Sequence, residues 1–210
     1  MTRIYFYKLV ADNGGAPCVK DGLLSLAICK PMIRRKADED DWIFGFAANS
    51  LFTDNRLIYI ARVTEKVIEG KYYEASRFSG RGDCIYARKD GRFEWRQGAL
   101  HHGPEHLAHD LGDRPEYERA SVLLSNDFRY FGANGTDDFK SRFPLVRDAV
   151  EALGRGYRVV QSDELNSQFM KVQAQAWKES HRKVVGNPTS EPQRSVCHRT
   201  KSCGVLTANP

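Results

Sequence analysis

The strongest constraint on the fold is a series of short segments rich in β-branched and aromatic residues, each followed by turn formers. Residues 3–10 form the first segment, and a glycine-rich loop follows over residues 11–17. Residues 41–47 and 56–65 are the clearest strands, and we expect them at the centre of a sheet. Many short strands with few helices predict a barrel or a curled sheet rather than a parallel, doubly wound one.

Later segments predict one hairpin, one further strand and two helices. Residues 89–92, Lys-Asp-Gly-Arg, are typical of a hairpin turn, and residues 120–125 predict a strand. Helices are expected over residues 145–153 and from Ser162, as N-cap, to about residue 177. His, Asp, Gly and Pro dominate residues 100–118, which predicts a long surface loop or a lid.

Hydrophobic residues make up 41% of the 210 positions, enough for one ordinary core. We therefore expect one domain over residues 1–177. Residues 178–210 hold six Lys or Arg and two Glu, so they carry four of the five net positive charges. This composition predicts a basic, disordered tail that could bind phosphate or a protein partner. The rest of the chain is nearly neutral and shows no general basic face.

Cysteine spacing and hydropathy indicate the compartment. The five cysteines are scattered, with no Cys-x-x-Cys pair, which fits a reducing environment and disfavours a zinc knuckle. No apolar run approaches the roughly 20 residues that span a bilayer. The start of the chain lacks a secretory cleavage site. We expect a cytoplasmic protein that does not bind membranes.

The histidine-rich segment is the main candidate for polar chemistry. It contains the following residues: His101, His102, His106, His109, Asp110 and Asp113. Gly103 and Pro104 interrupt any regular helix between the histidines, so we predict neither a metal site nor a cofactor here. A catalytic or base-contacting histidine and a merely solvated loop both remain open.

Other catalytic motifs find no support in the sequence. There is no Gly-x-Ser-x-Gly elbow, no P-loop and no Gly-x-Gly-x-x-Gly motif. Cys29 and Cys84 have apolar neighbours, where a thiol usually packs rather than reacts. A nucleotide triphosphatase, a dinucleotide enzyme and covalent catalysis are therefore not predicted.

Aromatic and guanidinium side chains in loops or at strand ends suggest base recognition. Aromatic faces stack on bases, and Arg pairs with phosphates or base edges. Packing in the core is the alternative for each aromatic residue. The set is Arg34, Arg35, Trp42, Arg77, Phe78, Tyr86, Phe128, Tyr130 and Phe131.

Several segments together resemble the nucleotide modification associated domain 2 family, in the right order: residues 12–17, 26–35, 41–45, 63–65, 82–86 and 122–132. A charged residue before Trp-Ile-x-Gly, and an apolar strand ending in Val-x-Glu, are similar to the EVE, ASCH and YTH branches of the PUA-like superfamily. The resemblance implies an α+β, mainly β fold: a PUA-like bent barrel of mostly antiparallel strands with a base-binding pocket. It also implies a link to modified DNA bases in phage and bacterial systems.

The resulting hypothesis is a protein that binds a modified base or nucleotide, with DNA favoured over RNA. Its pocket would lie between the first loop, residues 30–35 and residues 82–86. Basic groups would contact phosphate or base edges, aromatic groups would stack, and Asp12 or Asp83 would accept from an exocyclic donor. The predicted ligand-binding residues are Asp12, Lys30, Arg34, Arg35, Trp42, Arg77, Tyr86, Phe128 and Tyr130.

Two alternatives come from other functional classes. One is an enzyme that transfers or hydrolyses a group on a modified nucleotide, with Asp83 or His102 as general acid/base. The other is a scaffold or antitoxin-like protein whose basic tail binds a partner.

Overall fold

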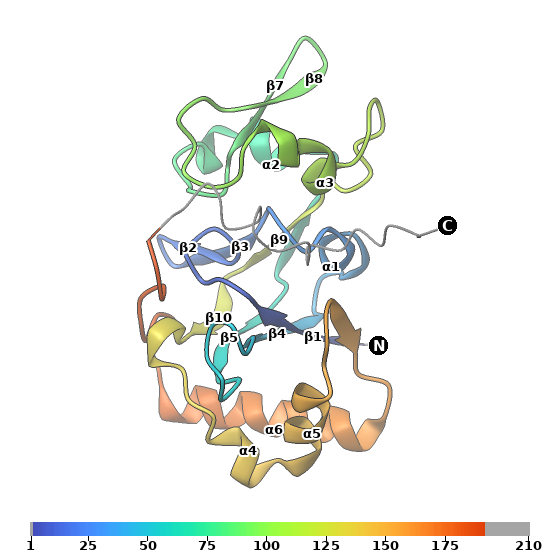
Figure 1. Ribbon diagram of the computed structural model, residues 1–210. Helices are drawn as coiled ribbons and strands as arrows, with labels where there is room; N and C mark the ends of the chain where they lie inside the picture. The colour runs from blue at the N-terminus through green and yellow to red at the C-terminus, as the bar shows by residue number, and fades with distance from the viewer. Residues whose placement is uncertain (1, 192–210) are drawn as a thin grey trace, which may run out of the picture.

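A five-stranded sheet forms the middle of the computed structural model, which describes residues 2–191 (Figure 1). Its strand order is β10-β5-β4-β1-β11, and only β1 and β4 are parallel. The two strands predicted at the centre, β4 and β5, are central neighbours, as expected. In spatial order the strands span Asp127–Tyr130, Leu57–Arg62, Trp42–Ala47, Ile4–Leu9 and Tyr157–Val159.

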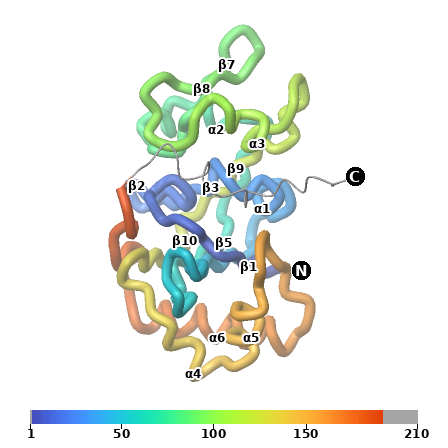
Figure 2. Tube along the Cα trace, viewed as in Figure 1, coloured from blue at the N-terminus to red at the C-terminus, as the bar shows by residue number. Residues whose placement is uncertain are grey.

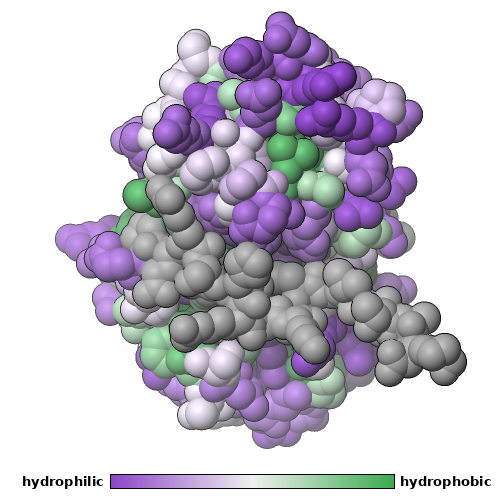
Figure 3. Space-filling view, turned by 45° about the horizontal axis from the view of Figure 1, so that its top comes forward, coloured by the Kyte–Doolittle hydropathy of each residue, from purple (hydrophilic) through white to green (hydrophobic). Residues whose placement is uncertain are grey.

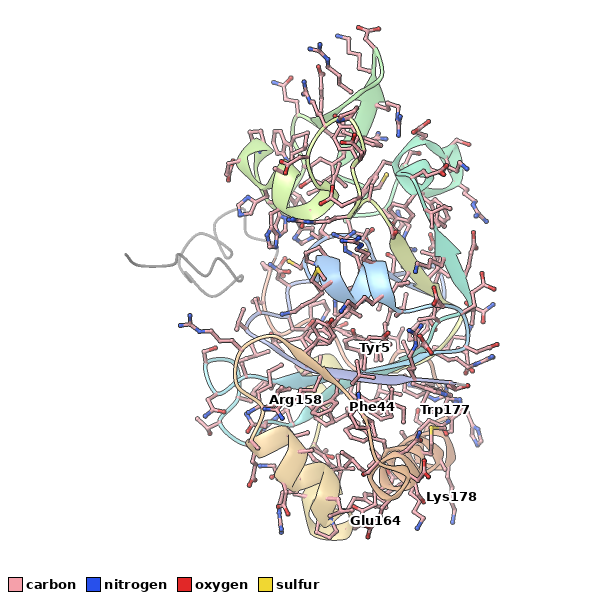
Figure 4. All side chains as sticks on the ribbon, turned by 90° about the vertical axis from the view of Figure 1, so that its right-hand side faces the viewer. Tyr5, Phe44, Arg158, Glu164, Trp177 and Lys178 are labelled. Carbon is pink, nitrogen blue, oxygen red and sulfur yellow. The ribbon has the colours of Figure 1, made fainter. Side chains whose placement is uncertain are left out.

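Helices cover one face of this sheet. They are α4 (Phe139–Arg142), α5 (Pro144–Glu151) and α6 (Asp163–Glu179). Because side chains alternate along a strand, Phe44 faces the helices and packs with the cluster that includes Trp177, whereas Tyr5 points to the opposite face (Figure 4). All six residues of β4 are buried, so the sheet is covered on both faces.

A second, four-stranded sheet and helix α1 (Pro31–Lys36) lie on the opposite face. Its order is β2-β3-β9-β6, with strands Cys18–Lys20, Leu23–Leu26, Val122–Ser125 and Glu65–Val67. The mixed, mainly β architecture agrees with the expected α+β class. Between residues 2 and 191, however, the strands form open sheets and no closed barrel, so the expected PUA-like barrel is not confirmed.

The remaining elements form an upper lobe with its own apolar cluster (Figures 1 and 2). The hairpin of β7 (Tyr86–Lys89) and β8 (Arg92–Trp95) turns at residues 89–92 as predicted. The predicted surface loop over residues 100–118 is wrong in part, because it folds into two short helices and buries Leu111 and Tyr117. The lobe's helices are α2 (Lys71–Glu74), η1 (Ser76–Phe78), η2 (Pro104–His106) and α3 (Leu107–Leu111).

Both predicted helices of the C-terminal half are confirmed as α5 and α6, and the Ser162 hydroxyl caps α6 by accepting from the Leu165 amide at 3.2 Å. After α6 the chain returns to the sheet. Val184 bridges Tyr130 beside η3 (Gly132–Asn134), and the Thr189 amide donates to the Asp12 carbonyl at 2.9 Å. The first part of the predicted tail thus contacts the domain, and its remainder, residues 192–210, lies outside the described residues.

The surface is mostly hydrophilic on the face shown in Figure 3, with small hydrophobic patches between the charged groups. Across residues 2–191 no helix has the length and apolar character that crossing a membrane requires.

Gly45 in the middle of β4 is required by close packing. Its register partner on β5 is Tyr59, and a Cβ at Gly45 would collide with the Tyr59 ring. We expect Gly45→Ala to lower the free energy of unfolding by about 1–3 kcal/mol, because overpacking a core strains it. Gly154→Ala is the control, since a Cβ there meets nothing within 4 Å. Urea unfolding measures both variants, and equal stability would contradict this account.

Candidate active site

Cys29 lies at a sharp turn between strand β3 and helix α1. The turn is strained, because Cys29 (φ 57°) and Lys30 (φ 42°) both adopt the left-handed backbone conformation that non-glycine residues rarely take. Pro31 then begins the helix, where its missing N–H costs nothing. The half-buried thiol is thereby presented at the point where the chain reverses. Strand–turn–helix elbows present nucleophiles in this way in other enzymes.

His102 and Asp110 complete a chain of contacts with this thiol. The Cys29 Sγ lies 3.2 Å from His102 Nε2, and His102 Nδ1 lies 2.7 Å from Asp110 Oδ2. Asp110 sits on α3, which lies directly above α1 in Figure 1. A nucleophile bonded to a base that a carboxylate orients is the arrangement of covalent catalysis by thiols and hydroxyls.

Asp110 is completely buried, and two further donors hold its carboxylate. The Cys29 amide donates to Oδ1 at 2.9 Å, and the Tyr86 hydroxyl donates to Oδ2 at 2.8 Å. These contacts orient the imidazole toward the sulfur. The Tyr86 hydroxyl therefore supports the base, whereas sequence reasoning assigned its ring to stacking.

Arg34 ties the segments of the site together. Its guanidinium is fully buried, and within the described part of the chain it donates only to backbone carbonyls, at 2.6–2.7 Å. The acceptors are Cys29, Asp110, Arg119 and Ser121. A planar group with five donors can satisfy several segments at once, which an ammonium cannot do. Arg34 is thus a framework residue in this structure, whereas sequence reasoning proposed it as a ligand-binding residue.

Electrostatics favour a charged imidazole between the carboxylate and the sulfur. Burial opposes the imidazolium, but hydrogen bonds to Asp110 and Cys29 outweigh burial and raise the pKa of His102 to about 11. Burial likewise disfavours the carboxylate, yet the hydrogen bond and charge of His102 bring the pKa of Asp110 below its ordinary value. A protonated His102 at neutral pH favours a thiolate at Cys29, the reactive form of the side chain.

His101 directly precedes His102 in the chain, but its pKa shifts in the opposite direction. Burial, together with the charge of the neighbouring His102, lowers the pKa of His101. The nearby Cys29 opposes this shift without reversing it. Two adjacent histidines therefore differ at neutral pH, one neutral and one protonated.

Three of the predicted site residues other than His102 lie close to Cys29: Lys30, Arg34 and Tyr86. Lys30 directly follows the thiol, and its ammonium lies 4.8 Å from the centre of the Tyr7 ring. The Tyr7 hydroxyl in turn bonds to the Tyr59 hydroxyl at 2.9 Å.

Asp12 and Tyr130 form a pair that joins the first loop to the sheet. The Tyr130 hydroxyl donates to Asp12 Oδ1 at 2.7 Å, and both residues are buried. The other carboxylate oxygen, Oδ2, is buried and has no hydrogen-bond partner among residues 2–191. Burial raises the pKa of Asp12, although the bonds from Tyr130 and the Thr189 backbone oppose that shift.

The other predicted residues lie apart from the thiol. Trp42 and Phe128 pack in the two core clusters on opposite faces of the sheet. Arg77 is exposed and pairs with Glu65, and Arg35 is exposed on α1. The structure therefore gives these four side chains no common pocket with Cys29.

Asp83 is enclosed in a second polar network. It is completely buried and accepts from Ser25 at 2.5 Å and from Tyr72 at 2.6 Å, with Arg81 at 3.7 Å. With its oxygens satisfied and no exposed surface, Asp83 stabilises the junction of the upper lobe rather than facing a substrate. We therefore place it in the framework, whereas the sequence suggested a general acid or a base contact.

Sequence reasoning did not select Cys29 or Asp110. The sequence favours packing for Cys29 and names Asp110 only as a neighbour of the histidines, whereas the structure places His102 in contact with both side chains. The available signal in the sequence was an apolar segment followed by Cys29, Lys30 and Pro31. This order is typical of a strand, a turn and the start of a helix, the arrangement that can present a nucleophile. Residues 2–191 contain no group of three or more His, Cys, Asp or Glu side chains arranged to hold a metal ion.

The fold and site define an α+β domain that carries a Cys-His-Asp constellation between its central layers and its upper lobe. The chain belongs to the nucleotide modification associated domain 2 family, whose model matches residues 1–194. The match thus includes the first part of the predicted tail. No curated protein and no solved structure matches the chain.

The stabilising role of the four hydrogen bonds from Arg34 to backbone carbonyls can be tested by a conservative substitution. We expect Arg34→Lys to lower the free energy of unfolding by about 2–5 kcal/mol, because a lysine leaves several buried acceptors without donors. Arg35→Lys on the same helix is the matched control, and its effect should stay within about 0.5 kcal/mol. Urea unfolding compares them, and similar losses in both variants would refute the framework role of Arg34.

The opposite shifts of the two histidines predict their charge states. The ordinary pKa of a histidine is 6.5. Because the pKa of His102 is raised, this residue keeps its proton when the pH rises above 6.5, whereas His101, whose pKa is lowered, loses its proton below pH 6.5. Long-range ¹H–¹⁵N NMR at pH 8 should show an imidazolium at His102 and a neutral ring at His101. His102→Gln assigns the signals. A His102 ring that titrates near pH 6.5 would contradict the charged triad.

Proposed function

We propose that this protein is a thiol-dependent enzyme that hydrolyses or transfers an acyl group carried by a modified nucleotide. Cys29 is the nucleophile, His102 is the general acid/base and Asp110 orients His102. One observation carries the proposal. The imidazole of His102 contacts the Cys29 sulfur at 3.2 Å through one ring nitrogen and the buried Asp110 carboxylate at 2.7 Å through the other. This adopts the enzymatic alternative of the sequence analysis and keeps His102 in its role there.

The chemical step follows from the order of these groups. The Cys29 sulfur attacks the carbonyl carbon of an amide or ester, and a sulfur–carbon bond forms. The bond to the leaving nitrogen or oxygen breaks, and His102 delivers its proton to that leaving atom. Water or an amine then attacks the thioester, His102 accepts its proton, and the thiolate is regenerated.

Lys30 supports an anionic substrate such as a nucleotide. It directly follows Cys29, and throughout residues 2–191 its ammonium forms no ion pair. An ammonium beside a reactive thiol is suited to a phosphate group, as in many phosphate sites. Family membership points to the same substrate class, because the family is associated with nucleotide modification. Deoxynucleotides are the first substrates to test.

A second candidate is binding of a modified nucleotide without turnover, the main hypothesis from the sequence. An open depression beside α3 favours it, because Trp95 and Arg114 line it with Leu107. An aromatic face and a guanidinium are suited to a base and a phosphate. Pro104, two residues beyond His102 in the chain, also lines the depression, whereas Cys29, His102 and Asp110 do not.

Turnover of an acylated nucleotide tests the proposal. We expect the full-length protein to release acetate from N4-acetyl-2′-deoxycytidine 5′-monophosphate and to carry an acetyl group on Cys29 in trapped samples. Cys29→Ser and His102→Gln should each reduce the rate by about 10³-fold or more, as loss of a catalytic triad member does in other enzymes. Product is followed by chromatography, and the acyl-enzyme by mass spectrometry of the Cys29 peptide.

Cys84→Ala is the control for loss of a thiol. Cys84 is buried in the apolar cluster of the upper lobe, so this variant should keep the wild-type rate. Full activity in Cys29→Ser would overturn the assignment of the nucleophile. Tight binding of the nucleotide, with no product and no Cys29 adduct, would support the binding function instead.

A further inference from the structure

His101 is a buried polar side chain that the triad does not use. Only 4% of the residue is exposed, and its ring makes no hydrogen bond to the part of the chain that the structure describes. Its ring nitrogens are not among the fully enclosed side-chain atoms that lack a partner within residues 2–191, so they keep some accessible surface. The imidazole therefore has hydrogen-bonding capacity left for a group that enters from outside.

Two glycines fix the position of this ring. A Cβ at Gly15 would lie 2.7 Å from His101 Nδ1, which is closer than real Cβ atoms approach, and a Cβ at Gly82 would lie 3.6 Å from Nε2. The backbone of the first loop and that of the segment before β7 thus enclose the ring. A Cβ at Gly15 would displace the ring, whereas a Cβ at Gly82 would make only an ordinary van der Waals contact, so it is the glycine at position 15 that permits the observed orientation.

The enclosed ring belongs to the residue that directly precedes His102, whose Nε2 lies 3.2 Å from the Cys29 sulfur. The charges of Cys29 and His102 both act on His101, and His102 takes a left-handed backbone conformation with φ 50° that turns the chain between the two imidazoles. Because its pKa is lowered, His101 is neutral at neutral pH and carries one N–H donor and one acceptor nitrogen.

The proposed reaction needs a hydrogen-bond donor that the triad does not supply. When the thiolate attacks a carbonyl, negative charge develops on the oxygen, and enzymes stabilise it with fixed donors. The backbone N–H of the nucleophile often serves this purpose. Here the Cys29 amide already donates its hydrogen bond to Asp110 Oδ1, so it does not serve as the donor to the substrate oxygen.

We propose that His101 donates a hydrogen bond to the carbonyl oxygen of the substrate as Cys29 attacks the carbonyl carbon. The inference rests on the proposed function and defines the recognised group as the carbonyl of an amide or ester. In this step the sulfur–carbon bond forms while the π pair of the carbonyl moves to oxygen. The pair returns as the leaving group departs, and His101 keeps its proton throughout.

Two reagents that attack the same thiol separate this role from a structural one. Iodoacetamide alkylates sulfur by displacing iodide at a CH₂ group, and no oxyanion forms. p-Nitrophenyl acetate acylates sulfur through a tetrahedral oxyanion. In His101→Phe we expect acylation of Cys29 to fall about 100-fold, as when an oxyanion donor is removed, while alkylation stays within about two-fold. Mass spectrometry of the Cys29 peptide measures both rates in the full chain.

Two further variants make the comparison specific. His101→Gln keeps an N–H donor and should recover most of the acylation rate. His181→Phe removes an exposed histidine after α6 and should change neither rate.

The outcomes distinguish this inference from the proposed function. A wild-type Cys29 that reacts with neither reagent would overturn the proposed function, and this inference with it. Normal reaction of the wild type with both reagents, and equal changes of the two rates in His101→Phe, would overturn this inference alone. A selective loss of acylation, recovered in His101→Gln, would establish the donor.

Discussion

The buried guanidinium of Arg34 is the interaction on which the rest of the site depends. It donates to carbonyls from the turn after β3, from α3 and from the segment that leads into β9. These segments are far apart in sequence, yet one buried cation requires all of them as acceptors at once. The thiol on the first segment and the carboxylate on the second are therefore held at a fixed separation, and His102 fills the space between them.

The same framework sustains backbone strain at the thiol and at the imidazole. Cys29, Lys30 and His102 all take positive φ values, which cost energy and persist only where the surroundings impose them. In return, the sulfur and the imidazole are already in contact before any substrate binds. Under the proposed function, such a thiol would need little reorganisation, which is the physical basis of catalysis by a preorganised site.

Much of the fold was predictable, because it follows from local pattern. Apolar runs identified β4 and β5, an Asp-Gly turn identified the β7–β8 hairpin, and Ser162 marked the start of α6. The barrel was not confirmed, since strand composition does not determine which edges pair. Aromatic residues such as Trp42 were ambiguous, because a ring that stacks on a base and a ring that packs in a core have the same sequence signal.

The sequence by itself determined the kinds of element, the family and one residue of the triad, His102. Only the tertiary structure brought Cys29 into contact with His102 and enclosed Asp83 in a buried polar network. The reason is that the chemistry of a thiol or a carboxylate depends on its solvation and on the groups within hydrogen-bond distance. Cys29 and Asp110 are 81 positions apart in the chain, so the contacts of Cys29, His102 and Asp110 exist only once the upper lobe has folded onto α1.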